Sequence, residues 1–177
     1  MVEDKLLLWR FKNGSEDALC RIYQKYRTRL LKLASALSQD TGLAEDIVQD
    51  VFVSFAQSAR RMKVDGNLRA YLTTSVANRI RNRLRDGRSE QNVNLVDAGA
   101  VTSKARTPDQ WVVYSENMRK VNDVLKQLPY EQREVVLLHV HGDMKFKSIS
   151  EIQQVSINTV LSRYRYAVEK LRAKLKE

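Results

Sequence analysis

The sequence of 177 residues contains only two prolines and six glycines, a composition that favours long helices and argues against a turn-rich sheet. Lysine and arginine number 31 against 21 aspartates and glutamates, and the formal net charge of +10 predicts a polyanionic partner: nucleic acid, an anionic membrane surface or an acidic protein. The N-terminal stretch "MVEDKLLLWRFKNG" has neither a secretory signal nor an apolar run of about twenty residues, so we expect a cytoplasmic protein without membrane insertion. A single cysteine, Cys20, excludes a disulfide within the chain, and its apolar surroundings predict a small buried side chain.

The N-terminal half has the periodicity of three amphipathic helices. After Ser15, a candidate N-cap, apolar residues recur at steps of three and four as far as Leu37. The segment 40–42 interrupts the pattern, and a second apolar face then continues to about residue 60. A loop that ends at Asn67, a second candidate N-cap, precedes the third helix. The apolar side of that helix consists of Leu68, Leu72, Val76, Ile80 and Leu84.

The polar side of the third helix is unusually basic. Residues 60–88 contain nine lysines or arginines and two acidic residues. A helix that is merely solvated usually places glutamate four residues from lysine or arginine, and such acids are missing here. The composition therefore favours an anionic partner for this face.

The apolar periodicity disappears at residue 89, and the polar stretch 89–108 predicts a flexible linker. We therefore expect an all-α protein with two small helical domains, at 1–88 and 109–177. Fully extended, about twenty residues span at most roughly 66–72 Å, which would let the domains bind separate sites on a large partner.

In the second domain a helical pattern begins at Asp109 and ends before Pro129. The segment "YEQREVVLLHVHG" predicts the next helix, with Gly142 as its C-cap. Two further helical patterns, at about 147–153 and from Ile157 onward, are separated by three residues. This spacing is typical of a helix-turn-helix, although an ordinary three-helix bundle can produce it as well.

The last helical pattern has two different sides. At about 100° per residue, the side expected to face the core contains Ile157, Val160, Leu161, Tyr164, Val168, Leu171 and Leu175. The other side contains Asn158, Thr159, Ser162, Arg165, Tyr166 and Glu169, with Arg163 and Lys170 on its flank. A recognition helix that contacts base edges in the major groove needs such a polar beginning. In the turn before it, Gln154 stands where glycine is preferred, and a left-handed conformation there should cost about 1 kcal/mol.

Two parts of the chain resemble the bacterial extracytoplasmic-function (ECF) RNA polymerase sigma factors. "LPYEQREVVLLHVHGDMKFKSISEIQQVSINTVLSRYRYAVEKLR" is similar to their C-terminal, promoter-binding region. "LAEDIVQDVFVSFAQ" followed by "LRAYLTTSVANRIRNRLRD" is similar to their N-terminal region. The resemblance implies a sigma factor that binds core RNA polymerase and starts transcription at specific promoters. Region 2 (1–88) would recognise and melt the minus 10 element, and region 4 (109–177) would recognise the minus 35 element.

The resemblance also implies roles for individual residues. Those matched to polymerase binding are Asp46, Gln49 and Asp50, which by their spacing also share one helical face. Those matched to minus 10 DNA are Arg61, Lys63, Asn67, Arg69, Asn78, Arg79 and Arg83. The minus 35 set is Asn158, Thr159, Ser162, Arg163, Arg165 and Tyr166. Leu161 and Tyr166 stand where many members of the family have basic residues, so minus 35 specificity cannot be copied from a relative.

The sequence predicts no enzymatic activity, no cofactor and no metal site. Glu45, Asp46 and Asp50 lie on one predicted helix, a pattern more typical of a protein-binding face than of a metal site. His139 and His141 are two residues apart and so point to different faces of a helix. The expected partners are core RNA polymerase and promoter DNA, and an anti-sigma factor is a further candidate.

Two other functions remain open at this point. One is a stand-alone helix-turn-helix transcriptional regulator with an N-terminal sensing or partner-binding domain, which would protect its operator without polymerase. The other is an adaptor on anionic membranes, which is disfavoured because the basic helix needs its apolar side for the core of its own domain.

Overall fold

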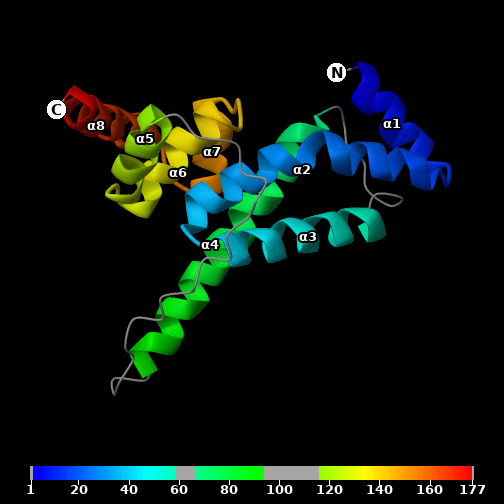
Figure 1. Cartoon of the computed structure of the whole chain (residues 1–177), viewed down its shortest axis with the longest axis horizontal. Coiled ribbons are helices and arrows are strands. Elements are labelled where there is room, and N and C mark those ends of the chain that lie inside the picture. Colours follow the sequence, from blue (N-terminus) through cyan, green and yellow to red (C-terminus); the bar gives the residue numbers. More distant parts are fainter. Residues whose placement is uncertain (1, 59–66, 94–115, 177) are drawn as a thin grey trace.

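The computed structural model describes residues 2–58, 67–93 and 116–176, which form eight α-helices and no strand (Figure 1). The helices are α1 (Val2–Lys12), α2 (Glu16–Ser38), α3 (Thr41–Ser58), α4 (Leu68–Val93), α5 (Glu116–Lys126), α6 (Tyr130–Val140), α7 (Phe146–Gln153) and α8 (Ile157–Lys176). The predicted all-α fold is confirmed. Of the candidate DNA-binding residues, Arg61 and Lys63 lie outside the described residues.

In the N-terminal unit, α1–α4, two helices begin at the predicted N-caps, α2 after Ser15 and α4 after Asn67, whereas α1 was not predicted. The Ser15 hydroxyl accepts a hydrogen bond from the Ala18 amide at 3.4 Å, at the start of α2. The Asn67 side-chain oxygen accepts one from the Ala70 amide at 3.1 Å, at the start of α4. Both side chains satisfy backbone donors that the first turn of a helix leaves unpaired, so both predicted N-caps are confirmed.

The predicted apolar sides of α2, α3 and α4 form the core of this unit, in which α2 packs against both of the others. The four residues of α4 from Leu68 to Ile80 on the predicted apolar side are at most 2% exposed. Leu84, the last residue of that side, is half-buried.

The expectation that Cys20 is buried is wrong, because its side chain is exposed. The buried side of α2 is centred on Ala18 and Ile22, at 1% and 0% exposure. Cys20 lies two residues from each, which is about 200° around a helix and therefore on the opposite side.

In the C-terminal unit, α5–α8, the central helix is α6, which packs against α7 and α8. Its residues Val135, Leu137 and Leu138 are at most 1% exposed. The predicted C-cap role of Gly142 needs correction, because His141 is the C-cap and the left-handed residue is Asp143 (φ 56°). Gly142 is instead required for space. A Cβ atom there would collide with the Leu138 carbonyl and would lie 3.1 Å from the Thr73 Cγ2 atom of α4.

The buried side of α8 differs in part from the prediction. Val160 and Ala167 are fully buried, whereas Ile157, Leu161 and Leu175 are exposed. The centre of the buried side is therefore rotated about 60° from Ile157, the residue around which the predicted side was centred. Tyr164 and Leu171, also predicted, do pack against the core.

The predicted linker overlaps the end of α4, which continues to Val93, past the expected boundary at residue 89. No cap or proline marks a helix end in "SEQNV", so the sequence offers no stop signal there. The remainder of the linker, from residue 94 to 108, lies outside the described residues.

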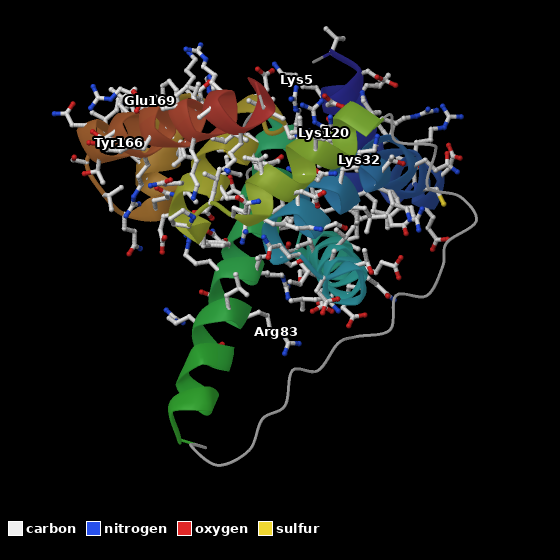
Figure 2. The ribbon with its side chains drawn as sticks, turned by 60° about the vertical axis from the view of Figure 1, so that its left-hand side comes forward. Lys5, Lys32, Arg83, Lys120, Tyr166 and Glu169 are labelled. Carbon is white, nitrogen blue, oxygen red and sulfur yellow. The ribbon has the colours of Figure 1, made fainter. Side chains whose placement is uncertain are left out.

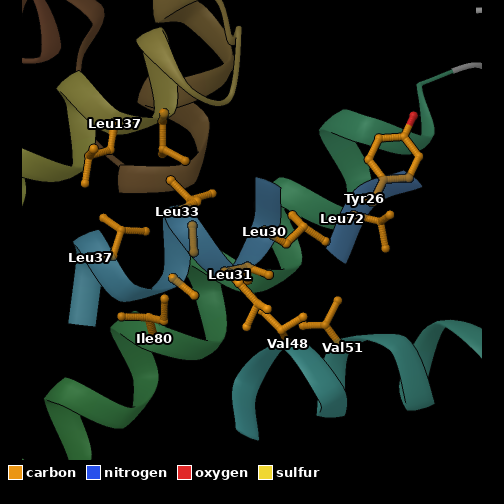
Figure 3. Packing of buried hydrophobic residues seen from close by; sticks show 14 of the residues in the cluster. Tyr26, Leu30, Leu31, Leu33, Leu37, Val48, Val51, Leu72, Ile80 and Leu137 are labelled. Atoms are coloured by element: carbon orange, nitrogen blue, oxygen red, sulfur yellow. The ribbon is translucent and has the colours of Figure 1, made fainter. Parts of the chain in front are cut away.

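The two units pack against each other and share one hydrophobic cluster. α6 contacts α2, and the close-up in Figure 3 shows Leu137 of α6 facing Leu33 and Leu37 of α2. The lower half of α4 in Figure 1 extends beyond the other helices of both units. The docked arrangement thus buries the apolar end of α2 and leaves Arg83 and Arg85 of α4 exposed.

The left-handed conformation predicted for Gln154 is present, with φ 55° and ψ 42°. We predict that Gln154→Gly stabilises the chain by about 0.5–1 kcal/mol, because glycine adopts this conformation without a steric penalty. Glu151→Gly, in the exposed interior of α7, is the matched control and should destabilise by about 1 kcal/mol. Urea unfolding of both variants measures this. Equal destabilisation by the two glycines would contradict the prediction.

Candidate nucleic-acid and polymerase interfaces

The polar face of α8 begins with a capped turn. The Ser156 hydroxyl accepts a hydrogen bond from the Thr159 amide at 3.1 Å and lies 2.9 Å from the Thr159 hydroxyl. Asn158, Arg165 and Tyr166 are exposed. Figure 2 shows Tyr166 projecting from the outer side of the helix. The cap satisfies a backbone donor in the first turn, which contains Asn158, whereas Arg165 and Tyr166 lie about two turns further along the helix.

Not every predicted residue of α8 points to that face. Thr159 and Ser162 are half-buried, and the Thr159 hydroxyl is engaged by Ser156. The Arg163 guanidinium donates to the Gln153 side-chain oxygen at 2.8 Å, back toward α7. The Arg165 guanidinium lies 5.6 Å from the centre of the Tyr166 ring, within the range of a cation–π contact.

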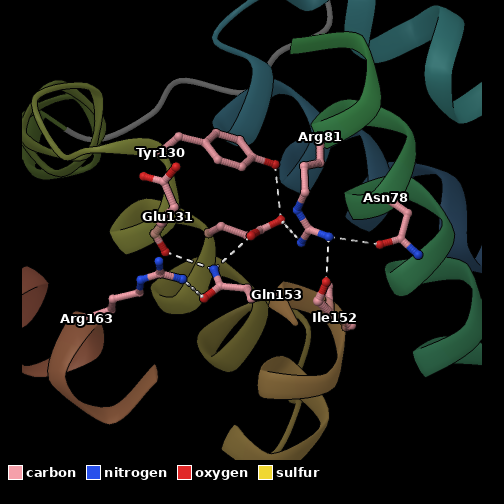
Figure 4. Close-up of polar contacts among 8 residues, drawn as sticks. Asn78, Arg81, Tyr130, Glu131, Ile152, Gln153 and Arg163 are labelled. Carbon is pink, nitrogen blue, oxygen red and sulfur yellow. Dashed lines mark hydrogen bonds and ion pairs between the residues drawn. The ribbon is translucent and has the colours of Figure 1, made fainter. Parts of the chain in front are cut away.

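A buried carboxylate, Glu134 of α6, organises the polar contacts beneath the helix-turn-helix. It is 0% exposed, and one oxygen accepts from Arg81 at 2.7 Å and from the Tyr130 hydroxyl at 3.1 Å. The other oxygen accepts from the Gln153 amide at 2.8 Å. We call these residues, together with Arg163, the Glu134 network (Figure 4). Burial and the adjacent carboxylate raise the pKa of Tyr130, so its hydroxyl remains a donor.

The Glu134 network crosses between the two units, since Arg81 belongs to α4. A carboxylate removed from water costs several kcal/mol unless paired and hydrogen-bonded, and here the pairing cation comes from the other unit. The second arm of Arg81 donates to the Ile152 carbonyl of α7 at 2.6 Å. One arginine therefore connects α4 to both α6 and α7.

α4 faces the C-terminal unit with Arg69, Thr73 and Arg81. The Arg69 guanidinium pairs with Asp143 at 3.1 Å and donates to the His141 carbonyl at 3.3 Å. Thr73 and Ala77 are at most 2% exposed. This side of α4, which the sequence suggested as part of a solvent-facing basic surface, is therefore an internal interface.

α2 contributes further polar contacts between the units, and its C-cap residue Gln39 donates to the Lys126 carbonyl at 3.3 Å. Arg29 donates to the His141 carbonyl at 2.7 Å. In the other direction, Arg133 of α6 is 7% exposed and donates to the Leu37 carbonyl in the last turn of α2 at 3.1 Å. Burial, and then the charges of Arg29 and Lys32, lower the pKa of His141, which favours its neutral ring.

The third candidate surface is the polar face of α3. Asp46, Gln49 and Asp50 are all exposed, beside the apolar Val53 at 49% exposure. Asp50 pairs with Arg79 of α4 at 3.3 Å. Sequence reasoning missed Val53, whose position three residues after Asp50 places it on the same face.

The candidate minus 10 residues are divided between structural and exposed positions. Asn67 caps α4, and Arg69 lies in the interface between the units. Arg79 contacts Asp50 and the Ser54 hydroxyl. Asn78 and Arg83 are exposed, and Figure 2 shows Arg83 projecting from α4 into open space. Several of the missing acids of the basic helix are thus supplied by distant parts of the chain.

The described residues include neither a candidate membrane-spanning helix nor a candidate metal site. In the ranges that the structure describes, no helix has the length and apolar character needed to cross a membrane. Nor does any group of three or more histidine, cysteine, aspartate or glutamate side chains in those ranges have an arrangement that could hold a metal ion.

The left-handed turn at Gln154 and the capped polar helix after it have the form of a helix-turn-helix, beside a second unit whose helix α4 keeps some exposed basic residues. Residues 22–90 match Sigma-70 region 2 and residues 118–171 match Sigma-70 region 4. The chain belongs to the ECF RNA polymerase sigma factors. It directs promoter recognition by RNA polymerase, in a family that is not enzymatic, and this decides against the stand-alone regulator and the membrane adaptor.

Relatives of similar length support this assignment. The chain is 28% identical over 171 residues to the RNA polymerase sigma factor CarQ of Myxococcus xanthus, covering 95% of each chain. It is 24% identical over 168 residues to the ECF sigma factor SigK of Mycobacterium tuberculosis, covering 94% of this chain and 90% of that protein.

Two solved structures share the fold. One is the sigma factor RpoE in complex with the anti-sigma factor NepR from Bartonella quintana, with a TM-score of 0.67, 26% identity and coverage of 88% of this chain and 97% of that one. The other is CnrH in complex with the cytosolic domain of CnrY, with a TM-score of 0.66, 21% identity and coverage of 98% and 97%.

Arg81 provides a test of the interface between the units. We predict that Arg81→Met destabilises the full chain by roughly 2–3 kcal/mol, because it leaves the Glu134 carboxylate buried without its cation. The value is below that for a fully buried pair because the Arg81 side chain is 31% exposed. Arg83→Met is the control on the same helix and should change stability by less than about 0.5 kcal/mol. Equal urea midpoints for the two variants would contradict the role given to Arg81.

Proposed function

We propose that α8 recognises the minus 35 element and that α4, with the residues before it, binds the minus 10 element. The observation that carries the first assignment is the exposed polar face of α8, on which Asn158 lies in the capped first turn and Arg165 and Tyr166 follow about two turns later. Two exposed residues of α4 support the second: Arg83, on its projecting part, and Asn78, whose side-chain oxygen accepts a hydrogen bond from Arg81 at 3.3 Å. Arg61 and Lys63 belong to the same proposal from sequence alone.

Promoter binding competes with the docked arrangement for Arg69. Its guanidinium already holds Asp143 and the His141 carbonyl. The N–H groups of Arg69 that bind Asp143 and His141 cannot bind a DNA phosphate at the same time. We therefore propose that the two units separate, or shift, when Arg69 binds the minus 10 region. The linker between them, proposed at 89–108, would permit such a separation.

We further propose that α3 binds core RNA polymerase through Asp46, Gln49 and Asp50. Their exposure on the side opposite the buried Ile47, Val48 and Val51 leaves a polar face available to a partner. Val53 adds an apolar contact at the same place, and interfaces commonly combine such a contact with charges at the rim.

An anti-sigma factor is a further proposed partner. RpoE, which is 26% identical to this chain and shares its fold, was crystallised in complex with the anti-sigma factor NepR. We propose that this chain is controlled in the same general way and that it acts in the cytoplasm, together with core RNA polymerase.

A run-off transcription assay with core RNA polymerase and a library of promoters tests the proposal. We predict specific transcripts only when the chain and core polymerase are both present, and weak binding to the same promoters by the chain alone. Transcripts that do not depend on the chain, or full footprints without polymerase, would contradict it.

The role of Asp50 can be separated from its ion pair with Arg79. We predict that Asp50→Arg weakens binding to core polymerase about ten-fold or more, since it reverses a charge in the proposed interface. The double variant Asp50→Arg with Arg79→Asp restores an ion pair inside the chain but should remain weak. Asp17→Arg, a charge reversal at the start of α2, is the control and should bind normally. Recovery of affinity in the double variant would show that Asp50 acts only through Arg79.

A further inference from the structure

Two aliphatic side chains at the start of α8 are exposed although they do not belong to the core. Ile157 is 44% exposed and Leu161 is 42% exposed, whereas Val160 between them is fully buried. A single exposed apolar residue needs no explanation. Here two of them lie one turn apart within the first five residues of the helix proposed to enter DNA.

These side chains are next to the polar residues proposed to recognise the minus 35 element. At about 100° per residue, Leu161 lies roughly 40° around the helix from Arg165 and roughly 60° from Asn158. Both of those residues are exposed. A helix placed with Asn158 and Arg165 against base edges would therefore bring Leu161 to the same groove.

The chemistry of the major groove includes one apolar group, the C5-methyl of thymine. We propose that Leu161, with Ile157 packed behind it, contacts a thymine methyl in the minus 35 element and makes that base pair a determinant of promoter choice. The inference rests on the proposed function of α8 and adds a residue and a base type to it.

A protein partner fits this surface less well than DNA. The apolar area consists of two aliphatic side chains bordered by Asn158 and Arg165, whereas the buried centre of a protein interface is broader and depleted of charge. The neighbouring guanidinium of Arg165 instead complements a polyanion. Arg165 can bind a phosphate or a base edge while Leu161 contacts a methyl group beside it.

The test replaces thymine by deoxyuridine, which removes only the methyl group. The probe is a promoter recovered by run-off selection, with each thymine of its minus 35 element replaced singly, and the measurement is its affinity for the chain bound to core polymerase. We expect a loss of about three- to four-fold at one or two thymines, the size that burial of one methyl gives. With Leu161→Ala this difference between thymine and uracil should disappear.

Two further variants make the result specific. Leu175→Ala removes a leucine of similar exposure, 44%, near the other end of α8, and should retain the full methyl effect. Leu161→Arg should move the preference at the same position from thymine toward guanine, because a guanidinium can bind guanine O6 and N7. Thermal unfolding should show that all variants fold, since both leucines are exposed.

The possible failures are distinguishable. A recovered promoter with no methyl-sensitive thymine in its minus 35 element, or a methyl effect that persists in Leu161→Ala, overturns this inference and leaves the proposed function intact. A library from which the chain and core polymerase recover no promoter overturns the proposed function, and with it the inference.

Discussion

The ion pair between Arg81 and Glu134 is the constraint on which the arrangement of the two regions depends. The Glu134 carboxylate is fully buried, and its cation comes from the other region of the chain. Without Arg81, region 4 would contain a buried charge with only neutral donors, which is costly in a protein interior. Region 2 thus completes the polar core of region 4, and the two regions pack as one body through the hydrophobic cluster they share.

The same network reaches the DNA-binding helix. Glu134 holds the Gln153 amide at the end of α7, and the Gln153 oxygen in turn holds Arg163 of α8. The position of α8 is therefore linked to α4 of region 2 through four side chains, those of Arg163, Gln153, Glu134 and Arg81. α4 also divides its charge: Arg69 and Arg81 face region 4, while Arg83 faces solvent. Residues of α4 therefore take part both in the docking of the two regions and in the proposed binding of DNA.

Three local features were predictable from the sequence, whereas the partnerships between distant residues were not. The conformations at Ser15, Asn67 and Gln154 follow from the few residues around them, and all three have the predicted form. Nothing near Glu134 signals that it is buried, because Arg81 lies 53 residues earlier. For the same reason the sequence suggested that the basic residues of α4 lack acidic partners, because those partners lie far away along the chain. The error at Leu161 has another origin, since a helical wheel gives the width of an apolar side better than its centre.

The most direct test measures the distance between the two regions in the free chain. Cys20 is the single cysteine and is exposed, so a spin label there can be paired with one at Glu169→Cys on the outer side of α8. Docking through Arg81 and Glu134 predicts one narrow distance distribution, which becomes broad when Arg81 is replaced by methionine. A broad distribution in the otherwise unaltered chain would contradict the account.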